Sequence, residues 1–350
     1  MRRPVCRRCS FGRARVPVTD LDDFLARSGL ATAKTDRHWT PLPGGISSDI
    51  WRVDLSDGRS LCVKRALPRL KVAVEWRAPV SRNTFEWAWM NFAAGVVPGA
   101  VPKPLACDER AGLFAMEFLP PQDYPSWKRQ LLEGRVEPAT AAAVGDTVGA
   151  LHAASAQRAD LARAFDTGEN FHAIRLEPYL LATSRRHPAL AQRLEVLVRR
   201  TAATRVALVH GDVSPKNILV GPRGPVILDA ECAWYGDPAF DIAFCLNHLL
   251  LKCLPRPRET AALRQTFDAF MAAYFARARF EPRPALEQRA AQLLPALLLA
   301  RVDGKSPVEY ITEEPDRERV RAVAVPLIRS TPTRLAQVAD CWHLQFQKTE

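Results

Sequence analysis

The first third of the chain shows the alternation of apolar and polar residues that is typical of β-strands. After a short amphipathic helix for which Asp20 would be the N-cap, a period-two pattern covers residues 50–55 and 61–64, with turn residues between them. A helical stretch follows at 83–94, and one more strand is expected at 113–118. The pattern therefore predicts an antiparallel hairpin, a helix and a further strand in this region.

The rest of the chain has mainly helical periodicity. Apolar residues recur at helical spacing around residues 144–152, a second helix is expected over 180–199, and everything from Phe240 onward reads as helix. Between these helices lie three short apolar runs separated by turn residues, which predict strands at 206–209, 218–220 and 226–228. A β-rich region is thus followed by a helical region that carries a small β insert.

The composition is that of an ordinary globular protein. Of the 350 residues, 47% are hydrophobic and 25% are charged, which allows one large domain or two lobes. The longest uncharged apolar run, residues 293–300, is far shorter than the roughly 20 residues that a membrane-spanning helix needs. The eight cysteines are scattered, so disulfide cross-links are not expected and a reducing cytoplasm is the expected location.

The net charge of +11 is concentrated at the N-terminus. Six arginines and no acidic residue fall within residues 1–19, and the remaining charge forms no basic stripe. Neither a nucleic acid nor a membrane is therefore expected as a partner. The basic segment is expected to be a disordered tail or to lie upstream of the true start. Cys6 and Cys9 form a lone Cys-x-x-Cys pair, and no second pair or nearby histidine follows that would complete a zinc site.

The residues that carry chemistry lie at the ends of the strands in the β insert. His210-Gly211-Asp212 follows the first of these strands, Asn217 comes five residues after Asp212, and Asp229 follows the third strand. Asn217 and Asp229 offer the hard oxygen ligands that Mg²⁺ prefers, and Asp212 is free to accept a proton from a hydroxyl group. The spacing therefore predicts a magnesium-nucleotide phosphotransfer centre.

This spacing resembles the catalytic loop and the metal-binding aspartate of the protein-kinase-like superfamily. Gly211 replaces the arginine of protein kinases, Ala230-Glu231 replaces their Phe-Gly, and no Ala-Pro-Glu motif follows. With Gly-Asp-Pro-x-x-Asp at 236–241, the pattern over residues 40–250 is similar to the aminoglycoside phosphotransferase and choline kinase family. The resemblance implies an α+β bilobal fold, with a small antiparallel β lobe and a larger, mainly helical lobe, and a kinase whose acceptor is a small molecule.

The same resemblance implies roles for further residues. Lys64 is expected to pair with the phosphates of ATP and Glu86 with Lys64, although Glu75 is a rival for that role. Asp241 is expected to brace the catalytic loop, and His210 to be structural. The other expected nucleotide contacts are a turn over the phosphates, the hinge between the lobes and a catalytic-loop lysine: Gly44, Gly45, Ser47, Ser48, Glu117, Phe118 and Lys216.

Three polar positions have two alternative roles each. Lys216 would contact phosphate or point to solvent. Glu231 would bind a second metal ion through water or cap a turn, with the turn slightly favoured. Residues 301–307 would line the acceptor pocket or form an exposed loop between helices, and the exposed loop is favoured.

We therefore expect three segments: a basic tail (1–19), a nucleotide-binding lobe (20–118) and a catalytic and acceptor-binding lobe (119–350). With ATP between the lobes and Mg²⁺ on Asn217 and Asp229, Asp212 would take the proton of an acceptor hydroxyl as it attacks the γ-phosphorus. Two alternatives stay open, a catalytically weak nucleotide-binding module and a kinase with a protein acceptor. Loss of Asp212 or Asp229 would mark the first alternative, and both residues are present.

Overall fold

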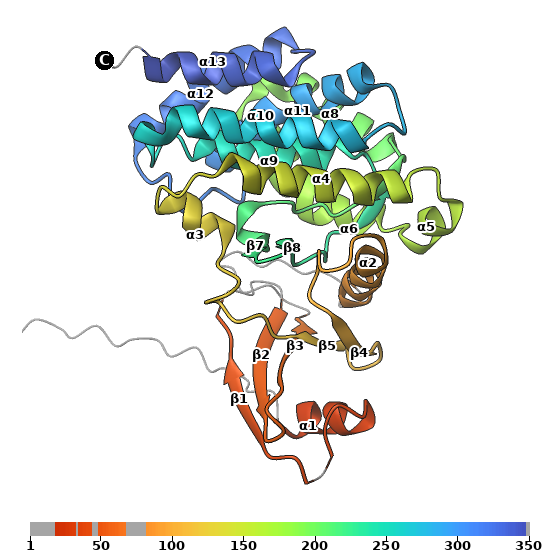
Figure 1. Cartoon of the computed structure of the whole chain (residues 1–350). Helices are drawn as coiled ribbons and strands as arrows, with labels where there is room; N and C mark the ends of the chain where they lie inside the picture. The colour runs from red at the N-terminus through yellow and green to blue at the C-terminus, as the bar shows by residue number, and fades with distance from the viewer. Residues whose placement is uncertain (1–17, 33, 44–47, 68–81, 348–350) are drawn as a thin grey trace, which may run out of the picture.

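A five-stranded antiparallel sheet is the basis of the smaller of two lobes (Figure 1). The strand order across this sheet is β1-β2-β3-β5-β4. The computed structural model describes residues 18–32, 34–43, 48–67 and 82–347. The bounds of the five strands are Arg37–Pro41 for β1, Ser48–Leu55 for β2, Ser60–Ala66 for β3, Pro104–Asp108 for β4 and Leu113–Glu117 for β5.

The β2–β3 hairpin confirms the strand pattern predicted for residues 50–64. Ile50 pairs with Lys64, and Val53 pairs with Leu61. Because side chains alternate between the two faces of a strand, Val53 and Leu61 share one face, where they form a small core with helix α1 (Val18–Arg27). Lys64 lies on the strand next to this core and is itself buried. The hairpin thus fixes where the Lys64 side chain can reach.

Two local predictions in the small lobe are wrong. Asp20 lies within the first turn of α1 and is not its N-cap, although a carboxylate there still interacts favourably with the helix dipole. Strand β4 was not expected, because Pro104 and its neighbouring prolines read as chain breaks; β4 is an edge strand, where proline is tolerated. The predicted helix at 83–94 is confirmed as part of α2 (Arg82–Val96).

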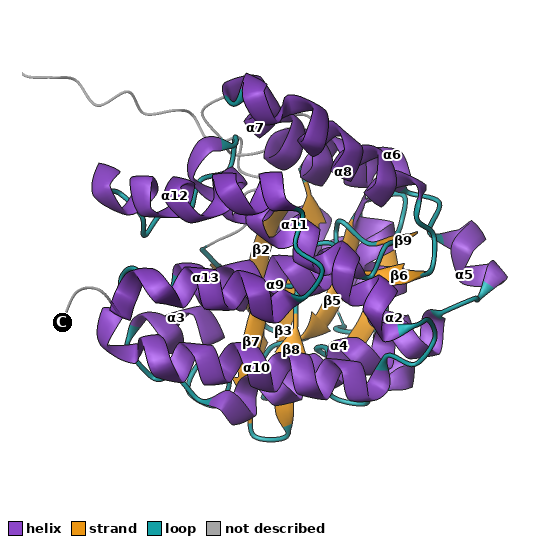
Figure 2. Cartoon of the chain, turned by 90° about the horizontal axis from the view of Figure 1, so that it is seen from above, coloured by secondary structure: helices purple, strands orange, loops and turns teal. Residues whose placement is uncertain are grey.

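The larger lobe consists mainly of helices, and α9 (Ala239–Leu251) lies among them (Figure 2). All residues of α9 are buried, which explains its mainly apolar sequence; Asp241, Asn247 and His248 are its polar residues. Other helices of this lobe are α3 (Trp127–Leu132), α4 (Pro138–Ser155), α5 (Ala159–Ala164), α6 (Gly168–Phe171), α10 (Thr260–Arg277), α11 (Arg283–Asp303), α12 (Glu314–Ser330) and α13 (Leu335–Gln347). A 3₁₀ turn, η4, lies at Pro257–Glu259.

Helices α4 and α10 approach each other closely because two residues of α4 have no side chain. A Cβ atom at Gly145 would overlap the carbonyl oxygen of Phe270, and one at Gly149 would lie 2.9 Å from the carbonyl oxygen of Tyr274. Both positions require glycine for this packing. Helix α4 also carries His152, which contacts Asp241, a residue that holds the catalytic loop described below. None of the helices in the described part of the chain is both long enough and apolar enough to span a membrane.

The single helix predicted over 180–199 is interrupted. The chain instead forms a π-helical segment η1 (His172–Leu181), helix α7 (Ala182–Arg186), a 3₁₀ turn η2 (Pro188–Leu190) and helix α8 (Ala191–Ala203). The break falls at Pro188, which has no backbone N–H to donate and which restricts the residue before it. The sequence contained this signal, and the apolar periodicity on either side masked it.

The β insert contains the three predicted strands and one that was missed. Strand β6 (Ala207–Val209) pairs with β9 (Trp234–Gly236), and β7 (Ile218–Gly221) pairs with β8 (Gly224–Ile227); the short β9 was not expected. Between β6 and β7 lies the 3₁₀ turn η3 (Pro215–Asn217). The insert therefore brings the loops after β6 and after β8 to the same side of the large lobe. Cys6, Cys9 and nearly all of the predicted basic tail lie outside the described residues.

Candidate active site

Lys64 is the centre of a buried ion-pair group that joins the two lobes. Its Nζ atom lies 2.8 Å from Oε1 of Glu86 on α2 and 2.6 Å from Oδ1 of Asp229, which follows β8. Burial alone would lower the pKa of Lys64, but the carboxylates of Asp229 and Glu86 outweigh it and raise this pKa. The structure thus brings together three residues that are far apart in sequence. Glu75, the rival of Glu86, lies outside the described residues.

The two carboxylates of this group differ in their affinity for protons. Burial, opposed by the charge of Lys64, raises the pKa of Glu86 to about 7. For Asp229, burial would also raise the pKa, but Lys64 and Lys216 outweigh it and lower this pKa. Asp229 therefore remains ionised near neutral pH. Its backbone has a φ of 68°, in the left-handed region that residues other than glycine rarely adopt, and such strained residues cluster at functional sites.

The catalytic loop is held by a buried aspartate from α9. Asp241 accepts hydrogen bonds from the backbone N–H groups of His210 and Gly211, both at 2.8 Å, and its Oδ2 lies 3.2 Å from Nε2 of His152. Asp241 is inaccessible to solvent, so each of these contacts replaces hydration that it has lost. This geometry agrees with the bracing role that the family resemblance implied.

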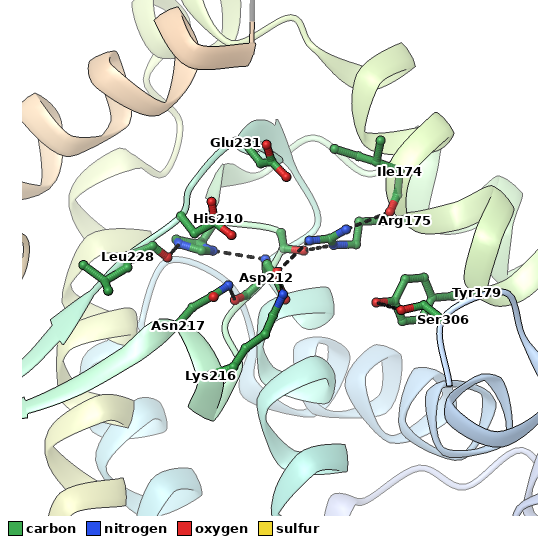
Figure 3. A network of polar contacts seen from close by, with 12 residues as sticks. Ile174, Arg175, Tyr179, His210, Asp212, Lys216, Asn217, Leu228, Glu231 and Ser306 are labelled. Carbon is green, nitrogen blue, oxygen red and sulfur yellow. Dashed lines mark hydrogen bonds and ion pairs between the residues drawn. The ribbon is translucent and has the colours of Figure 1, made fainter. Parts of the chain in front are cut away.

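His210 has a structural position between the two halves of the site. Its Nδ1 accepts a hydrogen bond from the backbone N–H of Asp212 at 3.0 Å, so Nε2 carries the proton and donates it to the carbonyl oxygen of Leu228 at 3.1 Å (Figure 3). Burial lowers the pKa of His210, which favours this neutral form. The ring thereby connects the loop after β6 to the end of β8.

The packing around Gly211 explains why this position does not have the arginine found in protein kinases. Gly211 has a φ of 79°, and a Cβ atom there would lie 2.8 Å from both the Cβ and the carbonyl oxygen of Cys232. An arginine at this position would require a different path for the loop. The replacement is therefore built into the backbone and into the packing of the following turn.

Asp212 forms ion pairs with two basic residues. Its Oδ2 lies 2.8 Å from Nη2 of Arg175 and 3.0 Å from Nζ of Lys216, whereas Oδ1 has no hydrogen-bond partner among the described residues. Burial would raise the pKa of Asp212, but Arg175 and Lys216 outweigh it and lower this pKa. The carboxylate is thus ionised and able to accept a proton through one uncommitted oxygen. Lys216, for which phosphate and solvent were the alternatives, is half exposed and contacts Asp212.

Arg175 is the residue of this site that sequence reasoning missed. It lies on η1, and besides contacting Asp212 it donates from Nε to the carbonyl oxygen of Gly211 at 2.5 Å and from Nη1 to that of Ile174 at 2.7 Å (Figure 3). It is buried. No motif surrounds Arg175 in the sequence, and its partner Asp212 is 37 positions away, so only the folded chain identifies it.

The side chains of Asn217 and Asp229 fit a magnesium ion by their chemistry. Asn217 donates from its amide nitrogen to the carbonyl oxygen of Asp212 at 3.2 Å, which leaves its amide oxygen for a ligand. Asp229 uses Oδ1 for Lys64 and is partly exposed, which leaves Oδ2. Two such hard oxygen donors, completed by water and phosphate, suit Mg²⁺. Among the described residues, no three or more His, Cys, Asp or Glu side chains are grouped as a metal site.

The remaining predicted nucleotide contacts differ in how far the structure describes them. Gly44, Gly45 and Ser47 lie outside the described residues, and Ser48 is buried at the start of β2. Glu117 and Phe118 line a cavity of about 870 Å³ together with residues of the sheet. The backbone N–H of Glu117 already donates to the carbonyl oxygen of Lys103 at 2.9 Å, so it is not the donor for an adenine ring.

Two other polar positions have different surroundings from those expected. Glu231 accepts from Nε of Arg82 at 3.0 Å, so its carboxylate pairs with α2 across the lobes rather than only capping a turn. Within residues 301–307, Arg301 and Asp303 belong to α11 and are buried, so the favoured interpretation as an exposed loop is wrong for this half of the segment. Helix α11 continues through Arg301 and Asp303, whose polar side chains had suggested that the helix ends before them.

Comparison with known proteins gives matches across most of the chain. The model of the phosphotransferase enzyme family matches residues 38–269. A methylthioribose kinase of Geobacillus sp. (strain WCH70) is 25% identical over 279 residues, which are 71% of this chain and 69% of that protein. Another, from Yersinia pseudotuberculosis serotype O:1b (strain IP 31758), is 28% identical over 276 residues, which are 66% of this chain and 67% of that protein.

One solved structure among those that resemble this chain is a macrolide 2'-phosphotransferase of Brachybacterium faecium without bound ligand. It has a TM-score of 0.50 and 18% sequence identity, and the likeness covers 92% of this chain and 97% of that one. At this identity the likeness concerns the fold alone. It confirms the predicted bilobal, kinase-like fold with a small antiparallel β lobe and a mainly helical larger lobe.

Proposed function

The chain belongs to the phosphotransferase enzyme family and is a small-molecule kinase, and we propose that Asp212 is the base that activates the acceptor hydroxyl for attack on the γ-phosphate of ATP. One observation carries this proposal: Asp212 is buried, ionised through two basic partners, and keeps one carboxylate oxygen uncommitted among the described residues. A base that accepts a proton from a hydroxyl must be ionised and must have an oxygen free to receive the proton.

We propose that Lys64 binds the α and β phosphates and that Glu86 holds it for this task. The support is their direct contact, at 2.8 Å, next to Asp229. A phosphate oxygen would take the place that Asp229 now occupies at Lys64, which would free the carboxylate for Mg²⁺ together with Asn217. The ion would neutralise charge on the phosphates. Binding and charge neutralisation of this kind supply most of the acceleration in phosphoryl transfer.

The two basic partners of Asp212 have separate tasks in this proposal. Arg175 is buried and makes four further contacts, two with backbone carbonyl oxygens and two with aromatic rings, so it keeps the carboxylate ionised and in place. Lys216 has a side chain that is 48% exposed, so it can turn from Asp212 toward the transferred phosphate. The proton would pass from the acceptor hydroxyl to Oδ1 or Oδ2 of Asp212 as the new P–O bond forms and the bond to ADP breaks.

We propose that the adenine ring binds at the hinge, where β5 ends at Glu117 and Phe118 follows, and that residue 118 marks the boundary between the lobes. Since the N–H of Glu117 is engaged, the donor would come from the residues after it. Ser48 and the turn with Gly44, Gly45 and Ser47 would cover the phosphates.

An Asp212→Asn variant tests the base directly. The amide keeps the shape of the side chain and cannot accept the proton, so we expect kcat to fall roughly 10²- to 10⁴-fold, the range for a positioned base. The thermal shift with Mg-ATP should persist, because at 100 times Kd a ligand adds about 2.7 kcal/mol of stability whatever the base does. Asp268→Asn, on the exposed side of α10, is the matched control and should leave kcat unchanged.

The same pair of measurements separates the alternatives. If Mg-ATP raises Tm but no acceptor increases ADP release in the wild type, the chain acts as a nucleotide-binding module. If Asp212→Asn turns over at the wild-type rate, the assignment of the base is wrong, while the family membership is unaffected.

A further inference from the structure

Three basic side chains without an acidic partner are buried where η1, α9 and α11 meet. Lys252, at the C-terminal end of α9, is 1% exposed; His248 on α9 is 6% exposed, and Arg301 on α11 is 8% exposed. Within the described ranges, none of the three forms an ion pair. Buried charges in proteins are ordinarily paired, since an unpaired one loses its hydration without compensation. We call these three residues the basic cluster; burial lowers the pKa of His248 well below its usual value, so its imidazole is neutral near neutral pH.

Lys252 is the most isolated member of the cluster. Its Nζ lies 3.3 Å from the centre of the Tyr310 ring, and it has no hydrogen-bond acceptor among the residues that the structure describes. Burial, opposed by Glu309 and reinforced by Lys128 and Arg301, lowers the pKa of Lys252 to about 6. Glu309 does not compensate the cluster, because its side chain is 62% exposed and is paired with Lys128.

The other two members each leave a buried nitrogen without a partner. Arg301 donates from Nη1 to the hydroxyl of Tyr179 at 3.0 Å and to the carbonyl oxygen of Ser306 at 2.6 Å, but its Nε has no acceptor. His248 lies 3.5 Å from the hydroxyl of Tyr310 through Nδ1, and its Nε2 has no partner. Buried polar groups are rarely left unsatisfied in a folded chain, so two such nitrogens next to Lys252 call for a partner.

Two aromatic rings connect the basic cluster to Arg175, the arginine that pairs with Asp212. The guanidinium group of Arg175, which pairs with Asp212, lies 5.9 Å from the ring centre of Tyr179 and 5.7 Å from that of Phe244. The same two rings contact the cluster: Arg301 lies 5.5 Å from the Tyr179 ring, and the His248 ring lies 5.5 Å from the Phe244 ring. Figure 3 shows Tyr179 and Ser306 next to Arg175 and Asp212.

We propose that the acceptor of this kinase carries an anionic group, a carboxylate or a phosphate, which binds the basic cluster while its hydroxyl group reaches Asp212. This inference rests on the proposed function, because it assumes that Asp212 marks the position of the hydroxyl. An anion would supply the acceptors that Arg301 Nε and His248 Nε2 lack, and it would favour the protonated form of Lys252, whose Nζ now faces only the Tyr310 ring. A cationic acceptor such as an aminoglycoside would instead meet the positive charge of Arg301.

Matched acceptor pairs that differ in one anionic group test the inference. Gluconate with sorbitol, glycerate with glycerol, and glucose 6-phosphate with glucose would be compared for ATP-dependent ADP release by the full chain, with glucosamine as the cationic comparison. We expect the anionic members of at least one class to have a kcat/KM about tenfold or more above their neutral partners, since a hydrogen bond to a charged group contributes about that factor. Gluconate and glucose 6-phosphate distinguish carboxylate from phosphate recognition.

A thermal-shift assay with Mg-ADP and the same compounds accompanies the kinetics. Any anion that binds the cluster should raise Tm above the value with Mg-ADP alone. If no anionic member exceeds its neutral partner in either assay, the inference is overturned. Turnover of neutral acceptors that depends on Asp212 would in that case still support the proposed function, and loss of the Mg-ATP shift would count against the nucleotide site instead.

Lys252→Met provides the variant test. It should lower kcat/KM for the preferred anionic acceptor about 10- to 100-fold, leave KM for ATP unchanged, and raise Tm, because it replaces an unpaired buried amine by an apolar chain of similar length. Lys34→Met is the matched control: Lys34 is exposed in the small lobe, and the variant should change none of these three quantities. A Lys252→Met variant that loses stability and keeps its acceptor affinity would identify the lysine as structural and contradict the inference.

Discussion

Two buried lysines of this protein have opposite electrostatic surroundings. Lys64 is 3% exposed and contacts the carboxylates of Glu86 and Asp229. Lys252 is 1% exposed and contacts the face of Tyr310, with no carboxylate within ion-pair distance among the described residues. Near neutral pH the first lysine is held in its charged form, and the pKa of the second is lowered to about 6.

This difference separates two kinds of site. At Lys64 the chain itself supplies the opposite charges; in the proposed function a phosphate oxygen would replace Asp229 at this lysine. At Lys252 the opposite charge is missing, so the chain carries an energetic penalty that a bound anion would relieve. Under these two proposals the first site serves phosphoryl transfer, and the second is where the choice of acceptor is expected to lie.

The largest effect is expected when the paired lysine is removed. Lys64→Met leaves the buried carboxylate of Glu86 without its counter-ion, and breaking a buried ion pair from one side costs about 3–5 kcal/mol. Part of this cost will be relieved, because Asp229 is partly exposed and Glu86 can take up a proton. Urea unfolding at pH 7 measures the change. An unfolding free energy equal to that of the wild type would show that the two lysines do not differ as described.

The same substitution at the unpaired lysine should have the opposite sign. The unfolded chain binds a proton on Lys252 below about pH 10.5 and the folded chain only below about pH 6, so lowering the pH between these values destabilises the wild type. The stabilisation of Lys252→Met over the wild type should therefore grow as the pH falls from 10 to 6, to a few degrees in Tm. Thermal unfolding at four or five pH values tests this, and a constant difference would contradict it.

A smaller effect is expected at the partner of the base. Arg175→Gln removes one of the two charges that keep the pKa of Asp212 low, so this pKa should rise toward its usual range or above it. Because the base must be ionised, the acid limb of the plot of kcat against pH should move to higher pH. At pH values well above that limb, kcat should fall less than it does on the limb. Arg193→Gln, an arginine on α8 outside the site, is the control. An unshifted acid limb would assign Arg175 to structure alone.

Much of the catalytic centre could be predicted because its residues follow strands at fixed spacings. Asp212 follows the first short apolar run after two residues, Asn217 directly precedes the second and Asp229 directly follows the third, so the strand ends bring them to one place. Lys64 and Glu86 were expected from the family resemblance, and the structure brings the two side chains into contact. Patterns of this kind can be recognised in the sequence because they involve residues that are close together in the chain.

The rest depends on contacts between distant positions. Arg175 reaches Asp212 across 37 residues, and Lys252 and Arg301 lie 49 positions apart on helices whose apolar periodicity hides them. Whether a buried basic residue is paired is decided by packing, and no spacing records it. Tertiary contacts also decide what a proline does locally. Pro104 lies within strand β4, where no strand was expected, whereas Pro188 interrupts a helix that was expected to be continuous.

The central claim is that Asp212 directs the γ-phosphate of ATP to a hydroxyl group of a small molecule. Phosphorus-31 NMR of the wild-type chain with Mg-ATP and the acceptor found in the matched pairs tests it most directly. We predict that the γ-phosphate signal is lost as a phosphomonoester signal of the acceptor appears, and that Asp212→Asn slows this conversion at least about 100-fold. A phosphomonoester that forms equally fast in Asp212→Asn, or ATP that is hydrolysed to free phosphate in the presence of every acceptor, would contradict it.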